Sequence, residues 1–361
     1  MKKLLTAVLC AAMLLSLAAC GEGPGTLPEP DAEDVPTPTG TPEPTPSPTP
    51  TPFYDPLSGE VIEEDISMDR PWAVMINNLQ QALPQCGVSE AELLYEIPAE
   101  GGITRMMAVF TDISGVEKLG SMRSIRPYYG EVGMSYDAII VHAGGSEAGY
   151  SLLRDNDWDH LDGVRETYAA APFQRDPDRM QYGVEHSLFA NGPKLIEAAE
   201  EKGFAFEHDG EYDYGLSFDD DAAEQCTDEA EFAQINFNSY KYTRFRYNAG
   251  EGVYYAEQYG EPYMDADYDV QLSFANLLFL QTEIKVIDSY GRLDVELTGE
   301  GSGWFVTGGR CVEITWQRDG LTSPFRYYLA DGSELSLSPG HSYIGIMGND
   351  AGCTVSFEEA E

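Results

Sequence analysis

The sequence predicts an α+β (or α/β) N-terminal domain followed by a small, mostly antiparallel β C-terminal domain. Three observations lead to this prediction. In the first part of the chain, apolar runs of strand length are separated by helical or loop segments, which favours mixed α and β structure. An acidic stretch that is poor in apolar residues comes next, and beyond it β-forming residues alternate with polar ones between turns. We therefore place the N-terminal domain at residues 53–215, an acidic connection at 216–232 and the C-terminal domain at 233–358.

The chain begins with the features of a lipoprotein signal peptide. Two lysines after the first methionine precede an uncharged apolar run, which is shorter than the about 20 apolar residues that a membrane-spanning helix needs. Small residues then lead to the cysteine in Leu17-Ala18-Ala19-Cys20. The prediction is a signal peptide over residues 1–19 and a diacylglycerol on Cys20, so that the mature chain is lipid-anchored to the cell membrane on its extracytoplasmic face. The alternative is an ordinary signal peptide that ends near a cysteine.

Residues 20–52 are predicted to be a disordered stalk. Pro, Thr, Gly and acidic residues dominate this segment, which includes Thr-Pro repeats between residues 45 and 52. Such a composition has too little apolar surface to offset the entropy lost on folding. Because a proline-rich chain extends by about 3.1 Å per residue and is semi-rigid, we expect the stalk to hold the folded part away from the membrane.

Five segments support the N-terminal domain. Residues 71–77 are an apolar run of strand length. Residues 89–96 are interpreted as a short helix capped by its first serine, or as a passage from helix to strand. Residues 103–111 and 136–141 are two further apolar runs that are typical of buried strands, and residues 193–202 have the propensity of a helix.

In the C-terminal domain, short runs of β-forming residues alternate with polar residues at a period of two. Turn sequences such as Asp319-Gly320, Asp331-Gly332 and Pro339-Gly340 separate these runs. This spacing is typical of a small antiparallel barrel or sandwich. The expected strands lie at 245–247, 252–256, 277–287, 293–297, 303–306, 312–316 and 325–328.

The composition is strongly acidic. The chain has 62 Asp and Glu against 21 Lys and Arg, a formal net charge of −41, and loss of the two lysines in the signal peptide makes the mature chain more negative. Nucleic acid repels a body of this charge, so we expect no nucleic-acid partner. The expected partners are the membrane, through the lipid on Cys20, and cell-wall components or other envelope proteins.

Four cysteines remain in addition to Cys10 in the signal peptide and Cys20 at the lipidation site. They form no Cys-x-x-Cys motif and no zinc-like Cys/His spacing, and we expect neither a bound metal nor a cofactor. Outside the membrane a disulfide is permitted. Cys311 with Cys353 is the pair that we consider, because both lie in the C-terminal part; the alternative is that both are free thiols.

The N-terminal domain contains one stretch in which the charge balance reverses. Between residues 105 and 126 four cations face two acids, and Arg123-Ser124-Ile125-Arg126 places two guanidinium groups three residues apart. A guanidinium binds carboxylate or phosphate with two parallel hydrogen bonds. Arg105, Arg123 and Arg126 are therefore candidates for an anion site. The alternative is that they pair inside the fold with the carboxylates of Glu96, Glu100 or Asp137.

A second candidate region is His142, at the end of an apolar run and followed by Gly144, Gly145 and Ser146. Glycines at a strand end allow backbone amides to approach a ligand closely. His142 is interpreted as a base, a ligand or a hydrogen-bonded core residue, and Ser146 lacks the Gly-x-Ser-x-Gly context of a nucleophile. The secondary candidates are Asn77, Tyr182 and His186.

Several long strings in the chain resemble the YerB-like lipoproteins, a family described as a domain of unknown function. They are RPWAVMINN, PQCGVSEAELLYEIPAEGGITRMMAVF, GSMRSIRPYY, YDAIIVHAGGSEAGYSLL, GSGWFVTGGRCVEITW and YYLADGSELSLSPGHSYIGIM. The resemblance covers about residues 55 to 350 and implies a two-domain extracytoplasmic lipoprotein, without a catalytic residue or substrate. Where the family often has Pro-His-Asn, this chain has Glu185-His186-Ser187, which leaves His186 available but puts a role of the asparagine in doubt.

The first functional hypothesis is a binding or scaffolding lipoprotein of the cell envelope, with an anion or partner site at the arginines. The alternative is an enzyme that acts on envelope phosphopolymers or glycans, with His142 or His186 as general base. The spacing of the arginines is similar to that of the LytR-CpsA-Psr phosphotransferases, although acidic metal-binding positions like theirs are not evident. A third hypothesis is cation-dependent adhesion through the acidic surface.

Overall fold

A computed structural model describes residue 25 and residues 52–359 of the chain. The predicted signal peptide, Cys20 and nearly all of the predicted stalk lie outside the described residues. The described residues from 52 to 359 form one compact unit by their contacts. The structure is mostly β: about 39% of the residues are in strands and 15% are helical.

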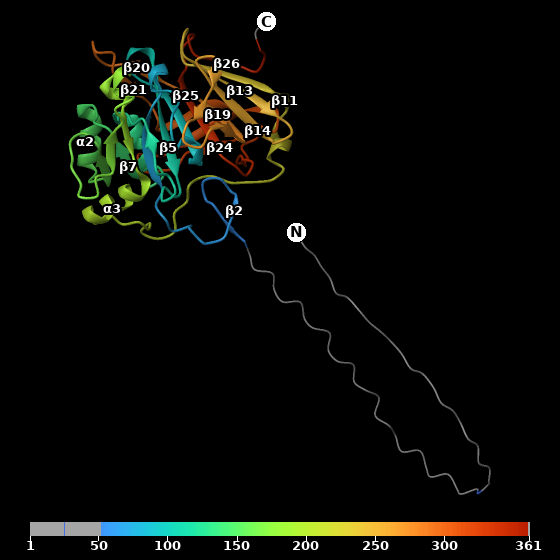
Figure 1. The fold of residues 1–361 in the computed structure, drawn as a ribbon. Coiled ribbons are helices and arrows are strands. Elements are labelled where there is room, and N and C mark those ends of the chain that lie inside the picture. Colours follow the sequence, from blue (N-terminus) through green and yellow to red (C-terminus); the bar gives the residue numbers. More distant parts are fainter. Residues whose placement is uncertain (1–24, 26–51, 360–361) are drawn as a thin grey trace, which may run out of the picture. The chain divides into compact units, whose positions relative to one another are not determined.

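One sheet of eleven strands runs through the compact unit (Figure 1). Its order is β11-β23-β22-β19-β25-β4-β5-β3-β7-β8, with β24 paired to β23, so strands from both ends of the chain belong to it. The strands are β3 (Trp72–Asn77), β4 (Leu93–Pro98), β5 (Thr104–Phe110), β7 (Ile139–His142), β8 (His160–Asp162), β11 (Asp228–Glu229), β19 (Asn276–Thr282), β22 (Gly299–Thr307), β23 (Arg310–Arg318), β24 (Arg326–Tyr328) and β25 (Ser342–Gly348).

The centre of this sheet is buried on both faces. Every residue of β3 is buried, and its side chains divide between two apolar cores, with Val74 and Ile76 in one and Ala73 and Met75 in the other. A continuous apolar run is the pattern expected of a strand with a core on each face. Full burial of each large apolar side chain contributes about 1.5–3 kcal/mol, so two-sided strands such as β3 and β25 supply much of the stability.

The two parts of the sequence meet where β25 pairs in parallel with β4, from Ser342 opposite Leu93 to Gly345 opposite Glu96. On its other side β25 pairs in parallel with β19. The C-terminal strands therefore extend the sheet that the N-terminal strands begin. The predicted division into two domains at residues 216–232 stays a prediction; in the structure this segment contains the short helical turn η6 (Ala222–Gln225) and strand β11.

The predicted α+β (or α/β) class of the N-terminal domain is wrong, because the described chain is mostly β with three α-helices. Residues 89–96 account for part of the error. They form the 3-10 turn η2 (Val88–Glu90) and then enter β4, whose residues from Leu93 to Ile97 are all buried. A capping serine with Glu92 three residues later suggests a helix, but side chains that are apolar on successive positions need two buried faces, which a strand in the middle of a sheet provides.

The three α-helices begin and end at residues with clear local signals. α1 (Pro127–Met134) has Pro at its first position, α2 (Glu147–Asp155) is capped by Ser146, and α3 (Gly192–Lys202) is capped by Asn191 and ends at Gly203 in a left-handed conformation. The helix expected at residues 193–202 is thus confirmed. Across residues 52–359, none of the helices combines the length and apolarity needed to cross a membrane.

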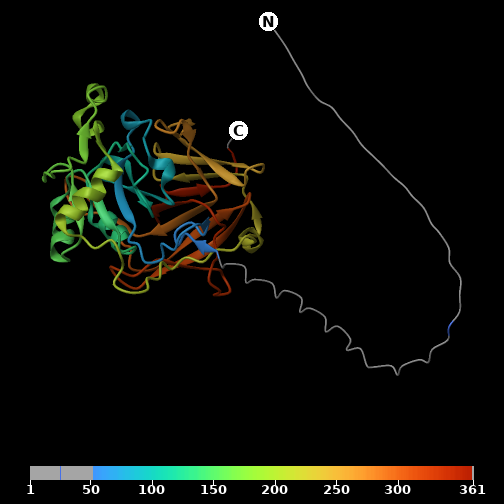
Figure 2. The same ribbon diagram turned by 60° about the horizontal axis from the view of Figure 1, so that its bottom comes forward.

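Between β8 and α3 the chain forms a protruding segment, which stands out from the body in Figure 2. It carries two 3-10 turns, η4 (Met180–Tyr182) and η5 (Val184–His186), and the side chains of Met180, Tyr182 and Val184 are exposed. Strand β10 (Leu188–Ala190) follows and pairs with β6 (Leu119–Gly120) and β9 (Phe173–Arg175).

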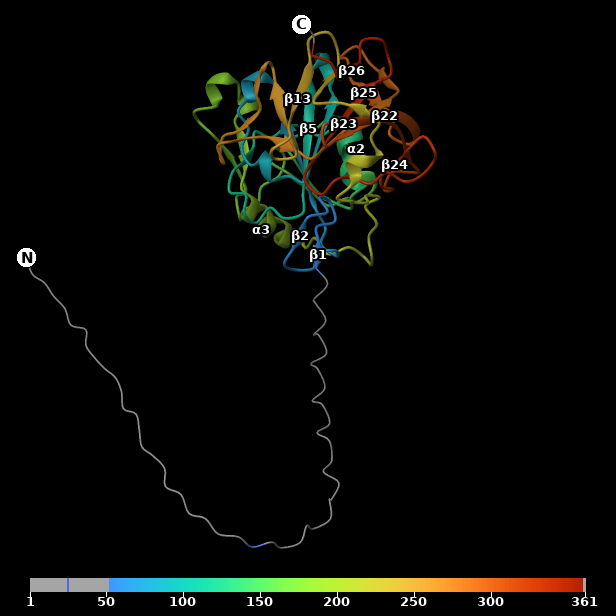
Figure 3. The same cartoon turned by 90° about the vertical axis from the view of Figure 1, so that its right-hand side faces the viewer.

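The remaining strands form a six-stranded antiparallel sheet and small strand pairs. Figures 1 and 3 show β1, β2 and α3 at one end of the compact unit and β26 at the other. The six-stranded sheet contains β12 (Phe232–Asn236), β13 (Tyr242–Asn248), β14 (Val253–Gln258), β15 (Glu261–Pro262), β18 (Ser273–Phe274) and β26 (Thr354–Ser356). The pairs are β1 (Phe53–Tyr54) with β2 (Val61–Ile62), β16 (Met264–Asp265) with β17 (Val270–Gln271) and β20 (Ile284–Val286) with β21 (Leu293–Val295). The other 3-10 turns are η1 (Gln80–Ala82) and η3 (Glu100–Gly102).

The predicted disulfide does not form. Within residues 52–359 all four cysteines are free and buried. Cys311 lies on β23 of the large sheet, whereas Cys353 precedes β26 of the six-stranded sheet and its Sγ lies 3.1 Å from the carbonyl oxygen of Phe237. Burial raises the pKa of the Cys311 thiol to about 11, so this thiol is a weak nucleophile at neutral pH.

Candidate functional site

The three arginines that the sequence singles out lie together at one end of strands β3 and β5. Arg105 pairs with Asn77 across these two strands. The loop at residues 121–126 runs past the same strand ends. The amide of Arg123 donates to the carbonyl of Met75, and Ile125 forms an isolated β-bridge with Gly145. The loop ends at Arg126, which is the N-cap residue of α1. The fold therefore gathers Arg105, Arg123 and Arg126 into one group, which we call the arginine cluster.

Glu100 is the carboxylate at the centre of the arginine cluster. Arg126 binds both of its oxygens, with Nη2 3.0 Å from Oε2, and Nη2 of Arg105 lies 3.3 Å from the same Oε2. Arg105 also donates to the carbonyl of Ser124 at 2.6 Å. Burial by itself would raise the pKa of Glu100, but the hydrogen bond from Arg126 and the charges of both arginines outweigh burial and hold that pKa below its usual value. One carboxylate thus serves two guanidinium groups.

Arg123 is the member of the cluster that lacks a bound carboxylate. Among residues 52–359 its side chain makes no hydrogen bond or ion pair, and its Nε is buried without a partner. Burial lowers the pKa of Arg123, and the charge of Arg126 lowers it further, while Glu185 acts against both. A half-buried guanidinium beside two others, with Glu185 as a partly exposed counter-charge, leaves a local excess of positive charge in an acidic protein.

His186 and Asn77 extend the site on the side of Arg123. Nδ2 of Asn77 lies 3.0 Å from Nδ1 of His186 and donates to the carbonyl of Glu185 at 3.1 Å. Because this amide nitrogen is a donor, Nδ1 of His186 accepts and the neutral ring carries its proton on Nε2. Burial lowers the pKa of His186, and the charge of Arg123 also lowers it, so the ring is neutral at neutral pH. The ring is only 4% exposed.

His142 is a hydrogen-bonded core residue. Its Nδ1 lies 2.9 Å from the carbonyl of Gly144 and its Nε2 lies 3.1 Å from Nδ1 of His160, so both ring nitrogens have partners. The ring is fully buried, and burial lowers its pKa to about 4. Beside it, the Asp162 carboxylate accepts from the amide of Gly144 at 2.8 Å. These contacts hold the turn that follows β7, and they leave no ring nitrogen of His142 available as a base.

The glycines and the serine after His142 also have structural contacts. Gly144 adopts φ +72°, and its carbonyl accepts from the amide of Ile125, so the turn lies against the loop of the arginine cluster. A side chain at Gly145 would meet Ile125 at 2.7 Å. The hydroxyl of Ser146 accepts from the amide of Gly149 at 3.1 Å and thereby caps α2.

Glu96 lies away from the arginine cluster, in the core between the two sheets. It is fully buried and forms an ion pair of 2.9 Å with Lys241. Five further side chains donate to its two oxygens; these are Asn78, Thr104, Thr243, Gln258 and Tyr343. Burial by itself would raise the pKa of Glu96, but Lys241 and the hydroxyl donors outweigh it and lower that pKa. Glu96 therefore joins β4 to β13, β14 and β25.

The remaining predicted residues fall outside the cluster or outside the described chain. The side chain of Tyr182 is 53% exposed, and its ring lies 5.8 Å from the guanidinium of Arg179. Asp137, one of the expected carboxylate partners, pairs with Arg70 and His208 instead. Cys20 is outside the described residues.

Two features escaped the sequence analysis. Glu185 faces Arg123, and the only local signal was its position beside His186. A pocket of about 620 Å³ lies elsewhere, lined in part by residues 212–220, which the sequence analysis treated largely as an acidic connection. The available signal there was the alternation of aromatic and acidic residues in Tyr212-Asp213-Tyr214.

Comparisons with known proteins agree with this description. The chain is 26% identical over 299 residues, which are 81% of this chain and 85% of the relative, to a protein of Bacillus subtilis (strain 168) named "Putative lipoprotein YerB". A crystal structure of the YerB protein from Bacillus subtilis superimposes with a TM-score of 0.72 at 25% identity, and it covers 84% of this chain and 99% of that one.

Two family models match the chain. The model of the N-terminal domain of the family described as "Protein of unknown function (DUF3048)" matches residues 57–205, and the model of its C-terminal domain matches residues 233–344. Together the two matches take in most of the sequence. The chain therefore belongs to the DUF3048 family, whose N- and C-terminal domains it contains in order.

Proposed function

We propose that the protein is a lipid-anchored binding lipoprotein of the cell envelope, held on the extracytoplasmic face through Cys20, and that the arginine cluster binds an anionic group of a partner. The observation that carries the binding proposal is Arg123. Its guanidinium is half-buried, and among residues 52–359 it has no bound carboxylate and its buried Nε has no partner. A buried polar group without a partner costs about 1–3 kcal/mol, and an anion that accepts from this guanidinium removes the cost.

The cluster suits a phosphate or a carboxylate. The cluster has three guanidinium groups and two facing carboxylates, since Glu100 binds Arg105 and Arg126 and Glu185 faces Arg123, so the positive charge exceeds the negative charge at this end of β3 and β5. Guanidinium groups bind such oxyanions with charge-assisted hydrogen bonds, which are stronger in a partly buried site than in water. Asn77 and His186 border the cluster, and the Nε2–H of His186 adds a further donor.

Binding is better supported than catalysis at this site. The alternative of an enzyme on envelope phosphopolymers or glycans needs a general base within reach of the bound group. Both ring nitrogens of His142 are engaged with Gly144 and His160. His186 has its accepting nitrogen turned toward Asn77. The hydroxyl of Ser146 caps α2. Each of the nucleophiles and bases considered from the sequence thus has a structural partner.

Arg123→Ala is expected to weaken the binding of inorganic pyrophosphate by at least about tenfold, since a charge-assisted hydrogen bond contributes about 1.5–3 kcal/mol. Titration calorimetry at low salt measures the dissociation constant, and binding by the wild-type protein is expected to weaken as ionic strength rises. Because the Arg123 side chain bonds to nothing else in residues 52–359, the variant is expected to keep its melting temperature.

Arg154→Ala is the matched control, because this arginine on α2 is 64% exposed and pairs with Asp155, outside the arginine cluster. It is expected to bind pyrophosphate as the wild-type protein does. Equal affinities of Arg123→Ala and the wild-type protein would contradict the anion site. Turnover of a phosphopolymer by the purified protein that Arg126→Ala abolishes would favour the enzyme instead.

Cys20→Ala is expected to move the protein from the membrane fraction to the soluble fraction of cells, because the thiol is the acceptor of the lipid anchor and two acyl chains are needed for stable attachment. Cell fractionation and intact-mass measurement of the mature N-terminus report the change. Cys10→Ala, within the predicted signal peptide, is the control and is expected to leave attachment unchanged. Membrane association of Cys20→Ala equal to the wild type would rule out this anchor.

A further inference from the structure

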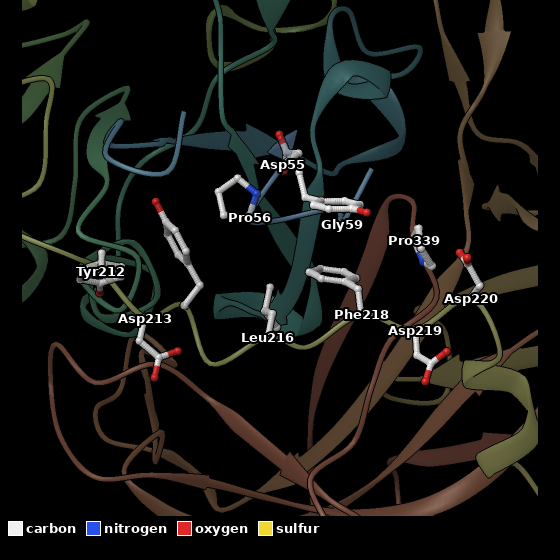
Figure 4. Close-up of a pocket in the computed structure, with 12 residues that line it drawn as sticks. Asp55, Pro56, Gly59, Tyr212, Asp213, Leu216, Phe218, Asp219, Asp220 and Pro339 are labelled. Atoms are coloured by element: carbon white, nitrogen blue, oxygen red, sulfur yellow. The ribbon is translucent and has the colours of Figure 1, made fainter. Parts of the chain in front are cut away.

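A pocket is lined by residues other than those of the arginine cluster, and these residues are aromatic and acidic instead of basic. Figure 4 shows this pocket, whose volume is about 620 Å³. Its lining combines aromatic rings, prolines and four aspartates, and among its twelve lining residues there is no lysine, arginine or histidine. The lining residues are Tyr54, Asp55, Pro56, Gly59, Tyr212, Asp213, Tyr214, Leu216, Phe218, Asp219, Asp220 and Pro339.

Three of the four carboxylates stand at the two ends of an apolar floor, and the fourth, Asp55, lies over its middle and accepts from the amides of Leu57 and Ser58. In Figure 4, Leu216 and Phe218 lie in the middle, Asp213 lies toward one end, and Asp219 and Asp220 lie toward the other. Because the aspartates are separated in this way, they do not converge on one point as the ligands of a metal ion would. An elongated ligand with an apolar body fits this distribution better than a single ion does.

The two ends differ in their free charge. Asp213 is already paired with Arg326. At the other end, Asp219 accepts only from the amide of Asp221, at 2.9 Å, and the side chain of Asp220 has no hydrogen bond or ion pair within the described residues. The negative charge near Asp219 and Asp220 is therefore not neutralised by a basic residue of the pocket.

The tyrosines present their aromatic rings to the pocket, because two of their hydroxyls are already hydrogen-bonded to other residues. The hydroxyl of Tyr212 donates to the carbonyl of Ser135 at 2.9 Å, and the hydroxyl of Tyr214 lies 2.7 Å from Nε2 of His208. These bonds hold the two rings in place. Tyr54 adds a ring that is 56% exposed. Aromatic faces beside carboxylates attract cations, through the ring quadrupole and through charge.

We propose that this pocket binds an organic ammonium ion, with its charged nitrogen at Asp219 and Asp220 and its alkyl body along Phe218 and Leu216 between the tyrosine rings. Charge complementarity selects this occupant over the chain's own proline-rich segment. Residues 21–52 contain six acidic residues and no lysine or arginine, so a pocket lined by aspartates repels them. An alkylammonium carries the opposite charge and an apolar body of the kind that the floor accommodates.

The test is titration calorimetry of the full-length protein with cadaverine, a five-carbon diamine, and with 1,5-pentanediol, its neutral counterpart. Cadaverine is expected to bind and the diol is not. The double variant Asp219→Asn/Asp220→Asn is expected to weaken cadaverine binding by at least about tenfold, and Tyr54→Ala by about threefold. The amide side chain introduced at position 219 retains an oxygen that accepts from the backbone N–H of Asp221, so the local turn is kept.

The matched control removes the same number of charges elsewhere. Glu197→Gln/Glu200→Gln changes two exposed carboxylates on α3, which contributes nothing to the pocket lining. This variant is expected to bind cadaverine within about twofold of the wild type, since exposed charges outside the pocket lining are screened by salt. Melting curves of both double variants establish that they are folded.

Three results would overturn the proposal: equal binding of the diol and the diamine, an unchanged affinity in Asp219→Asn/Asp220→Asn, or no binding of cadaverine at millimolar concentration. A further pair of probes identifies the source of the amine. Nα-acetyl-lysine amide represents an amine on an envelope peptide, and cadaverine represents a free amine. Tighter binding of the lysine derivative assigns the site to a peptide amine, and tighter binding of cadaverine assigns it to a free one. Acetylation of Nε of the lysine derivative, or of both nitrogens of cadaverine, is expected to abolish binding.

Discussion

Lys241→Met is expected to destabilise the folded protein by about 3–5 kcal/mol, because it leaves the carboxylate of Glu96 buried without its counter-charge. Glu96 is fully buried and Lys241 is 3% exposed, so water replaces little of the lost interaction. The remaining donors to Glu96, such as Thr243 and Tyr343, are neutral and supply hydrogen bonds without charge. Urea denaturation at pH 7, followed by tryptophan fluorescence, measures the loss of unfolding free energy.

Lys285→Met is the matched control. Lys285 pairs with Glu283 at 2.6 Å, but both side chains are more than half exposed, and exposed pairs contribute about 0–1 kcal/mol.

The pH dependence of the stability distinguishes the loss of the ion pair from the loss of packing around Lys241. Glu96 has a folded pKa below its unfolded value, so the stability that it contributes is full above about pH 4.3 and is lost as the pH falls through the lower folded pKa. The difference in unfolding free energy between Lys241→Met and the wild type is expected to become smaller in acid. If this difference did not change with pH, the loss of stability would be due to packing alone.

Acid is expected to destabilise the wild-type protein through His142. Its pKa is about 4 in the folded protein, below the usual value of about 6.5, so the unfolded chain takes up this proton first as the pH falls. The free energy of unfolding therefore decreases between about pH 6.5 and pH 4, by about 3 kcal/mol from this residue. Urea denaturation at several pH values in this interval measures the slope.

His142→Asn is expected to remove that part of the pH slope, although it lowers stability at pH 7 by its own loss of contacts with His160. The comparison is between slopes, which a constant loss of packing does not change. His341→Asn is the control, because it replaces a histidine that is partly exposed and makes none of these contacts. An unchanged slope in His142→Asn would show that His142 is not a neutral buried ring.

Several parts of the candidate site were predictable from the sequence because their signals are local. Arg105, Arg123 and Arg126 stood out as a cationic stretch in an acidic chain. The structure brings them together and pairs Arg105 and Arg126 with Glu100, one of the three carboxylates considered. The apolar runs at residues 71–77 and 103–111 became β3 and β5, whose pairing sets Arg105 opposite Asn77. The pairing of strands that are close in sequence therefore determines much of the arrangement of these side chains.

The roles of Glu96 and His142 could not be predicted, because each depends on segments distant in sequence. Glu96 and Glu100 are both near Arg105 in sequence, but the side chain of Glu96 meets Lys241, which lies 145 positions further along the chain. His142 ends an apolar strand, as a ligand residue of a strand end would, and only the pairing of β7 with β8 brings His160 against it. No periodicity in the sequence encodes either partner.

The sequence by itself determined the lipoprotein-like leader, the acidic charge, the apolar runs that become buried strands and the arginine stretch. These features are local, since they depend on composition and on the spacing of side chains along one segment. The tertiary structure alone decided that β25 lies between β4 and β19, that one sheet joins both parts of the chain, and which carboxylate meets which cation. Every strand offers the same backbone donors and acceptors to a neighbour, so the choice of neighbours follows from how the side-chain faces pack in three dimensions.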